Sequence, residues 1–112
     1  MIYHICKKSE WVLAKTAGSY EPESLLGEGF IHCSTDKQFE QVANFYFKDV
    51  PDLVALEIDE ERLKAPLKWE AVGENQFPHI YGPLEVHAVV REAELVLGAS
   101  GTLEFPFKPV LH

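Results

Sequence analysis

Residues 35–47 carry the most complete local signature in the chain, and this signature constrains the fold most. Thr35 and Gln38 have the spacing of a capping box, in which each side chain accepts a hydrogen bond from the other residue's backbone amide. The apolar residues that follow recur at helical spacing, which predicts that they pack in the core: Phe39, Val42, Ala43 and Tyr46. We therefore expect the longest helix to run from Asp36 to about Phe47, with Lys37, Glu40 and Gln41 in solvent.

Short segments with the character of strands surround this helix. They are apolar or alternate between apolar and polar positions, and they cover residues 2–6, 29–33, 53–58, 67–72 and 84–90. Residues 77–83 are expected to be irregular or short extended structure. This order, with helices early and strands late, predicts an α+β domain with a mixed or antiparallel sheet.

Smaller signals place the remaining elements. Ser9 can cap a helix over residues 10–17 that Gly18 ends, with Trp11, Leu13 and Ala14 on its buried side. Pro22 suits the first turn of a second, short helix, and Asp59 can cap one helical turn. Near the end of the chain, Phe105 and Phe107 are expected to pack across a sheet edge or the end of the core.

Length and charge exclude several classes of protein. The 112 residues predict a single domain, 1–112, and no apolar run approaches the ~20 residues that cross a bilayer. The N-terminus has no signal-peptide pattern, so we expect a cytoplasmic protein without a membrane partner. A formal charge of −8 with only two arginines disfavours duplex DNA or long RNA, although a small anionic ligand could still bind. Cys6 and Cys33 have no metal-site spacing and are expected to be reduced thiols.

Three extended segments share one arrangement of polar residues. His4 precedes Cys6, His32 precedes Ser34, and His79 precedes Tyr81, each by two positions. In a strand, such residues point to the same face, so each segment offers an imidazole beside a second polar group. These imidazoles could bind a ligand, or each could be a buried histidine that bonds to a backbone carbonyl. A metal site would require all three distant segments to converge, and we predict none.

Residues 32–35 (HCST) add a possible anion site. A strand that runs directly into a capped helix places Ser34 and Thr35 beside free backbone amides at the positive end of the helix. Such a corner could hold a phosphate, or Ser34 and Thr35 could act only as caps. On a later strand, Glu70 follows Trp69, and the sequence favours a solvated carboxylate there. His87 and the terminal His112 are assigned no role.

The phrases GFIHCST (residues 29–35) and FPHIYGPL (residues 77–84), with IYHI at residues 2–5, resemble the DUF952 family of small bacterial proteins of unknown function. The resemblance also includes residues 41–46, 56–59 and 69–70, so it extends over nearly the whole chain. That family is similar in fold to the ADP-ribosyltransferase superfamily, whose members bind NAD in a cleft of a split sheet. The resemblance therefore implies a small split mixed or antiparallel sheet with flanking helices.

The same resemblance implies roles for the histidine segments. His4 matches the first-strand position that holds ADP-ribose, and His32 with Ser34 matches the second motif, beside Thr35. The third position, often Glu, falls near His79 and Tyr81, where no Glu stands. RNA 2′-phosphotransferases also lack that Glu, but they hold phosphate with arginines.

Two functions follow from these observations. The first is an NAD- or ADP-ribose-like ligand cleft in an ADP-ribosyl- or phospho-transfer enzyme, with His4, His32, His79 and Tyr81 as catalytic residues. In that hypothesis His4, His32, Ser34, Thr35 and Tyr81 bind the ligand, and Tyr81 stacks on a planar ring. The alternative is a non-catalytic protein-interaction module with structural histidines, in which Tyr46, Trp69 and Phe107 contribute to an apolar patch. The sequence leaves the oligomeric state open.

Overall fold

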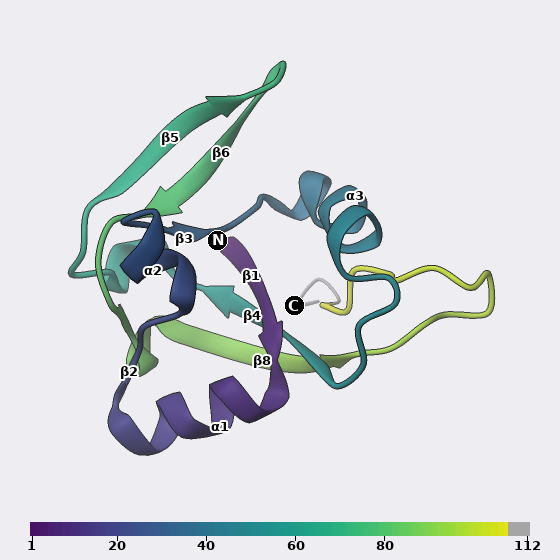
Figure 1. Cartoon of the computed structure of the whole chain (residues 1–112), viewed down its shortest axis with the longest axis horizontal. Coiled ribbons are helices and arrows are strands. Elements are labelled where there is room, and N and C mark those ends of the chain that lie inside the picture. Colours follow the sequence, from purple (N-terminus) through teal and green to yellow (C-terminus); the bar gives the residue numbers. More distant parts are fainter. Residues whose placement is uncertain (108–112) are drawn as a thin grey trace, which may run out of the picture.

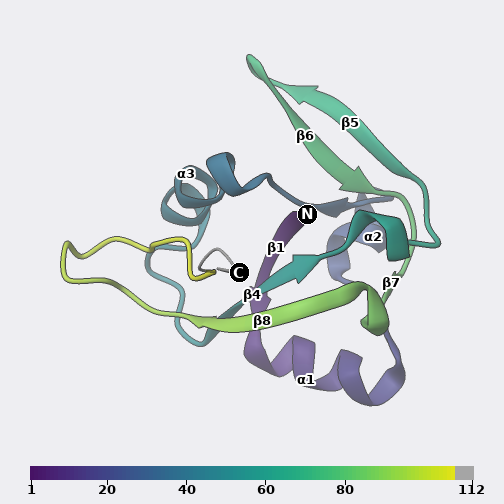
Figure 2. The same cartoon turned by 180° about the vertical axis from the view of Figure 1, so that it is seen from behind.

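A computed structural model describes residues 1–107, and it confirms an α+β fold with antiparallel sheets (Figures 1 and 2). One sheet has the order β1 (Ile2–Lys7), β4 (Leu53–Ile58), β8 (Val89–Leu95). A second has the order β3 (Ile31–His32), β6 (Asn75–Ile80), β5 (Leu67–Val72), and β2 (Ser19–Tyr20) pairs with β7 (Leu84–Glu85). All of these pairings are antiparallel. His112 lies outside the described residues.

The two three-stranded sheets meet at one backbone bridge, which we call the seam. The amide of Tyr3 donates to the carbonyl of Ser34, and the amide of Ser34 donates to the carbonyl of Tyr3, each over 2.8 Å. Beyond the seam, the β5–β6 hairpin extends away from the rest of the molecule in both views (Figures 1 and 2). The sheet is therefore split, and its second part is much less covered than its first.

Both faces of the β1–β4–β8 sheet are covered, which explains why every residue of β4 is buried. On one face, α1 (Lys8–Ala17) packs Trp11 and Ala14 against the side of β1 that carries Ile2 and Cys6. On the other, α3 (Asp36–Tyr46) and the C-terminal segment pack against Tyr3 and Ile5. Phe107 is buried there and Phe105 is half-buried, so both rings pack against this face of the sheet.

A partly buried ion pair joins β4 and β8, and its carboxylate is the buried member. Glu57 is 5% exposed and accepts two hydrogen bonds from Arg91, over 2.7 and 2.9 Å. It also accepts one from the hydroxyl of Tyr3 over 3.0 Å. Arg91 holds the pKa of Glu57 below its usual value, while burial together with the Glu57 carboxylate raises the pKa of Tyr3 to about 12. The pair is thus built into the fold between β1, β4 and β8.

The capped helix forms as predicted. α3 has both hydrogen bonds of the capping box between Thr35 and Gln38, and it is the longest helix of the described residues. Phe39 and Ala43 are buried, and Lys37, Glu40 and Gln41 are exposed. Val42 is only half-buried, and the prediction for Tyr46 is wrong, because this last helical residue is 65% exposed and packs its ring against Phe45.

The predictions for α1 and for residues 84–90 also need correction. α1 begins at Lys8 without a side-chain cap, so Ser9 is inside the helix, and Leu13 points away from the Trp11–Ala14 side into solvent. Residues 84–90 are not one strand, because the short 3-10 helix η2 (Val86–Ala88) separates β7 from β8. This turn buries Ala88, whose carbonyl accepts a hydrogen bond from the amide of Asp59.

Residues 77–80 belong to β6, a central strand, although Pro78 argues against a strand there. The exception has a physical reason: β3 pairs with β6 only at Ile80 and His79, so no ladder bond requires an amide at residue 78. The remaining short elements are α2 (Glu23–Gly27), with Pro22 immediately before it, and η1 (Glu60–Arg62), which Asp59 caps as predicted.

Candidate functional site

The register of the β3–β6–β5 sheet determines which polar side chains share a face. His79 of β6 lies opposite His32 of β3 on one side and opposite Lys68 of β5 on the other. Residues that face each other across antiparallel strands point to the same side of the sheet, as do residues two positions apart. The resulting group, with the rings that contact it, is called the histidine face: Phe30, His32, Lys68, Glu70, His79 and Tyr81.

Four aromatic rings gather on the histidine face. Phe30 stacks on His79 with ring centroids 4.2 Å apart and an interplanar angle of 22°. Phe30 also contacts the rings of His32 and Tyr81, at centroid distances of 4.8 and 5.3 Å. His32 meets His79 edge to face at 5.4 Å. His79 is consequently buried, while His32 is exposed on the outer side of the cluster.

A carboxylate holds two of these rings in place. Oε1 of Glu70 lies 2.9 Å from Nδ1 of His79 and also accepts a hydrogen bond from the hydroxyl of Tyr81. The hydrogen bond from Tyr81, and to a smaller extent the one from His79, holds the pKa of Glu70 below its usual value. The hydrogen bond to Glu70 in turn raises the pKa of Tyr81. Because an ionised carboxylate only accepts, Nδ1 of His79 carries the proton and Nε2 is its acceptor nitrogen when the ring is neutral.

Charged groups lie around the rings. Nζ of Lys68 is 4.7 Å from the centroid of the Tyr81 ring, and Nε2 of His32 is 2.5 Å from Oε2 of Glu28. The side chain of Glu70 is 39% exposed and that of His32 is 54% exposed, so both can be reached from solvent. The face therefore combines planar rings with a carboxylate and a cation in reach of a ligand.

His4 is not part of the histidine face. It points to the core side of β1 with Ile2 and Cys6, where Nδ1 donates to the carbonyl of His32 over 2.5 Å and Nε2 accepts from the hydroxyl of Tyr20 over 2.8 Å. Burial lowers the pKa of His4 to about 4, so the ring is neutral at pH 7. His4 touches the site only through the backbone of His32.

Ser34 and Thr35 are held by the backbone and by the helix cap. Ser34 is buried at the seam, whereas His32 is exposed, so the two side chains do not share an open face. Oγ1 of Thr35 accepts from the amide of Gln38 over 3.2 Å, which occupies it as the N-cap of α3.

The structure thus brings together His32, His79 and Tyr81 of the predicted site residues and separates His4, Ser34 and Thr35 from them. Sequence reasoning did not place Phe30 or Lys68 in the site, and it favoured a solvated carboxylate at Glu70. One signal could have found Glu70: the two-residue turn at Gly73 and Glu74 sets a hairpin register that brings β5 beside His79.

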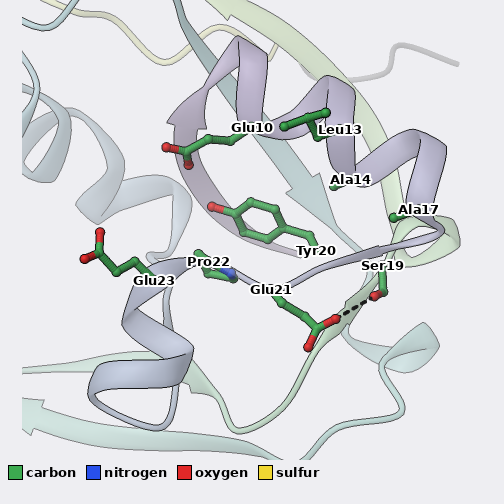
Figure 3. A pocket seen from close by; sticks show the side chains of 9 residues that line it. All are labelled: Glu10, Leu13, Ala14, Ala17, Ser19, Tyr20, Glu21, Pro22 and Glu23. Carbon is green, nitrogen blue, oxygen red and sulfur yellow. Dashed lines mark hydrogen bonds between the residues drawn. The ribbon is translucent and has the colours of Figure 1, made fainter.

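Two hollows in the described surface lie away from the histidine face. One of about 400 Å³ lies between α1 and residues 19–23, and Figure 3 shows Tyr20 in it beside Pro22, with the carboxylates of Glu10, Glu21 and Glu23 around it. Another of about 710 Å³ is lined by α1 and residues 50–52. The histidine face is therefore an exposed surface of a sheet and not the wall of either hollow.

Residues 1–107 contain neither a cluster of metal-binding side chains nor a membrane-spanning helix. No group of three or more His, Cys, Asp or Glu side chains in this range could hold a metal ion. No helix in the same range is both long and apolar enough to cross a membrane. Cys6 and Cys33 are both free and buried, and burial raises the pKa of each thiol, to about 12 for Cys6.

Comparison with known proteins gives the family. The family model described as "Protein of unknown function (DUF952)" matches residues 5–92. The chain belongs to the DUF952 family. A crystal structure of protein CC0527 from Caulobacter crescentus is 42% identical to this DUF952 protein, with 92% of each chain covered and a TM-score of 0.83. A solution NMR structure of CC0527 is also 42% identical, covers 90% of this chain and 89% of that one, and has a TM-score of 0.78. No curated protein matches this DUF952 chain.

Proposed function

We propose that the histidine face binds an NAD- or ADP-ribose-like ligand. One observation carries the proposal: four aromatic rings cluster on an exposed sheet surface, and a single carboxylate is hydrogen-bonded to two of them. The split sheet supports the same proposal, because the family resemblance implies an ADP-ribosyltransferase-like arrangement that binds its ligand beside such a sheet.

The rings and the carboxylate fit the ring and sugar parts of this ligand. The rings of Tyr81 and Phe30, both half-buried, can stack on a planar base. Glu70 receives both of its hydrogen bonds from the described residues at Oε1, so Oε2 is placed to accept from a ribose hydroxyl. This carboxylate comes from β5 and supplies the Glu side chain that is missing from the sequence around His79 and Tyr81.

The diphosphate part has fewer partners. Lys68 lies on the same face, and the exposed imidazole of His32 can donate a hydrogen bond to a phosphate oxygen. Since the whole chain carries a formal charge of −8, which repels an anionic diphosphate, we expect weak binding.

A transfer reaction at this site would use His79, Glu70 and Tyr81. Transfer of ADP-ribose from NAD breaks the bond between C1′ and the nicotinamide nitrogen and forms a bond from C1′ to an acceptor, which loses a proton. Glu70 orients His79 so that Nε2 can accept that proton. His4, Ser34 and Thr35 act as positioning residues, since they fix the backbone between β3 and α3.

An NMR titration with NAD, ADP-ribose and inorganic phosphate tests the proposal. We expect millimolar or tighter binding of the first two, with amide shifts at residues 68–71 and 79–81. Glu70→Gln and His32→Ala should each weaken affinity about tenfold, the loss of one charge-assisted hydrogen bond. His87→Ala, which removes an exposed imidazole outside the face, is the control. No shift with either nucleotide at 10 mM would refute the proposal.

The alternative, a non-catalytic interaction module, is favoured by a different observation. His4 is buried, neutral and hydrogen-bonded at both nitrogens, as a structural histidine should be. Tyr46 and Trp69 are 65% and 44% exposed, whereas Phe107 is buried and cannot contribute to a patch. This function predicts no nucleotide binding and leaves the exposed aromatics for a protein partner.

A further inference from the structure

We infer that the free edge of β5 pairs with β5 of a second copy of this chain, antiparallel and centred on Trp69. β5 is the outer strand in the order β3–β6–β5, and β6 is its one neighbour among the described strands. In Figures 1 and 2 it lies on the outside of the extended hairpin. Unpaired strand edges are templates for pairing with another chain.

The backbone groups that point outward can be identified from Pro78. Its carbonyl accepts a hydrogen bond from the amide of Cys33, so it points toward β3 and away from β5. Trp69 lies opposite Pro78 in the register. In an antiparallel pair, directly opposite residues either exchange both bonds or neither, so the amide and carbonyl of Trp69 point to the open edge. By the same alternation, those of Leu67 and Ala71 do as well.

The alternation of outward and inward backbone groups along β5 limits the registers in which two copies can pair symmetrically. A two-fold axis can pass through a residue whose groups point outward, which leaves Leu67, Trp69 and Ala71, or through one whose groups point inward, such as Lys68 or Glu70. An axis at Lys68 or Glu70 places that charged side chain directly opposite its own copy, which is destabilising. An axis at Trp69 overlaps residues 67–71 of the two copies and places Lys68 of each copy directly opposite Glu70 of the other. An axis at Ala71 would place Glu70 opposite Val72, and one at Leu67 would place Lys68 opposite Pro66. Within β5, only the register centred on Trp69 pairs opposite charges.

The side chains fit this register on both faces. Lys68 and Glu70 form a non-hydrogen-bonded pair, in which Cα atoms are about 4.5 Å apart and side chains are close. On the other face, Trp69, which is 44% exposed, meets its own symmetry mate. Because Lys68 and Glu70 are complementary in charge across the axis, the edge favours a second copy of β5 over an arbitrary extended peptide. The pairing makes one sheet through both copies and places Lys68 of the partner beside Glu70, whether or not the face binds a nucleotide.

Sedimentation equilibrium from about 10 µM to about 1 mM tests the inference, because such a small interface is weak. We expect the apparent mass to rise with concentration from 12.7 kDa toward twice that value. Lys68→Glu places carboxylates opposite carboxylates and should abolish the rise. The double variant Lys68→Glu/Glu70→Lys restores opposite charges across the axis and should restore the dimer. Lys48→Glu, the same charge change at an exposed residue outside β5, should leave it intact.

A backbone variant tests the edge without changing any charge. Ala71→Pro removes an outward amide while leaving the bonds to β6, so circular dichroism should be unchanged and the dimer lost. A wild-type protein that is monomeric at 1 mM would overturn the inference, and so would a folded Ala71→Pro or Lys68→Glu variant that still dimerises. These readouts use no ligand, so they are independent of the nucleotide titration.

Discussion

His4 and His79 are both buried imidazoles that donate from Nδ1, but their acceptors differ in charge. His4 donates to the backbone carbonyl of His32, and His79 donates to the carboxylate of Glu70. A carbonyl fixes the tautomer of a neutral ring, whereas a carboxylate also stabilises a positive charge. Of the two, His79 is therefore suited to proton transfer and His4 to holding the fold.

The buried neutral state of His4 makes stability depend on pH. Its pKa is about 4 in the folded protein and about 6.5 in the unfolded chain, so the unfolded state binds the proton more tightly. The stabilisation is complete above pH 6.5 and is lost as the pH falls from 6.5 toward 4, at up to about 1.4 kcal/mol per pH unit. In urea unfolding at pH 7 and pH 5, His4→Gln should show a smaller drop than wild type. The exposed His87→Gln should show the wild-type drop, and an unchanged drop in His4→Gln would assign the pH dependence to other groups.

The residue scale also shows what spacing in the sequence can and cannot predict about the site. His79 and Tyr81 are two positions apart on a strand, so their shared contact with Glu70 follows from strand geometry. Glu70 is on another strand, and its approach depends on the hairpin register. The prediction that Ser34 shares a face with His32 is wrong. It assumes that the strand continues to Ser34, whereas β3 ends at His32.

At the scale of elements, the sequence predicts a helix that has its own capping signals, but it does not predict where tertiary contacts interrupt a strand. α3 has a capping box and an apolar stripe that agree with each other, so its bounds follow from the sequence. The alternation of residues 84–90 is equally regular, but the chain turns at η2 because Ala88 packs in the core and bonds to Asp59. Alternation describes burial and contains no signal for where a strand changes direction.

The cap of α3 provides a test at this scale. Thr35→Ala removes the acceptor for the amide of Gln38 and should lower the free energy of unfolding by about 1 kcal/mol. Thr35→Asp retains a capping oxygen and adds a charge that the helix N-terminus favours, so it should be close to wild type. Chemical denaturation measures both. If Thr35 instead bound a ligand and did not support the helix, Thr35→Ala would unfold at the wild-type midpoint.

At the scale of the molecule, the two three-stranded sheets differ in how well they are protected. β4 is buried along its whole length and pairs on both sides, whereas β5 is mostly exposed and pairs on one. The split between them was expected only from the family resemblance. Local patterns cannot predict it, because the seam joins Tyr3 to Ser34 through backbone atoms alone.

Hydrogen exchange in dilute protein should reveal this difference. Amides of residues 54–56 should exchange at least about 100-fold more slowly than those of residues 70–72, because the hairpin can open without unfolding β4. Mass spectrometry of protein fragments measures both segments in one sample. Equal protection in the two segments would indicate a single cooperative unit and contradict the prediction.

The pairing of strands has a consequence for how the chain is made. β1, β2 and β3 all precede residue 50, and they pair with β4, β6 and β7, which all follow it. While a ribosome has released only the first half, each of these strands lacks its ladder partner, and their apolar side chains are exposed to chaperones and to other nascent chains. A polypeptide cut in the exposed loop at residues 48–52 should therefore yield two fragments that are unfolded separately and fold when mixed.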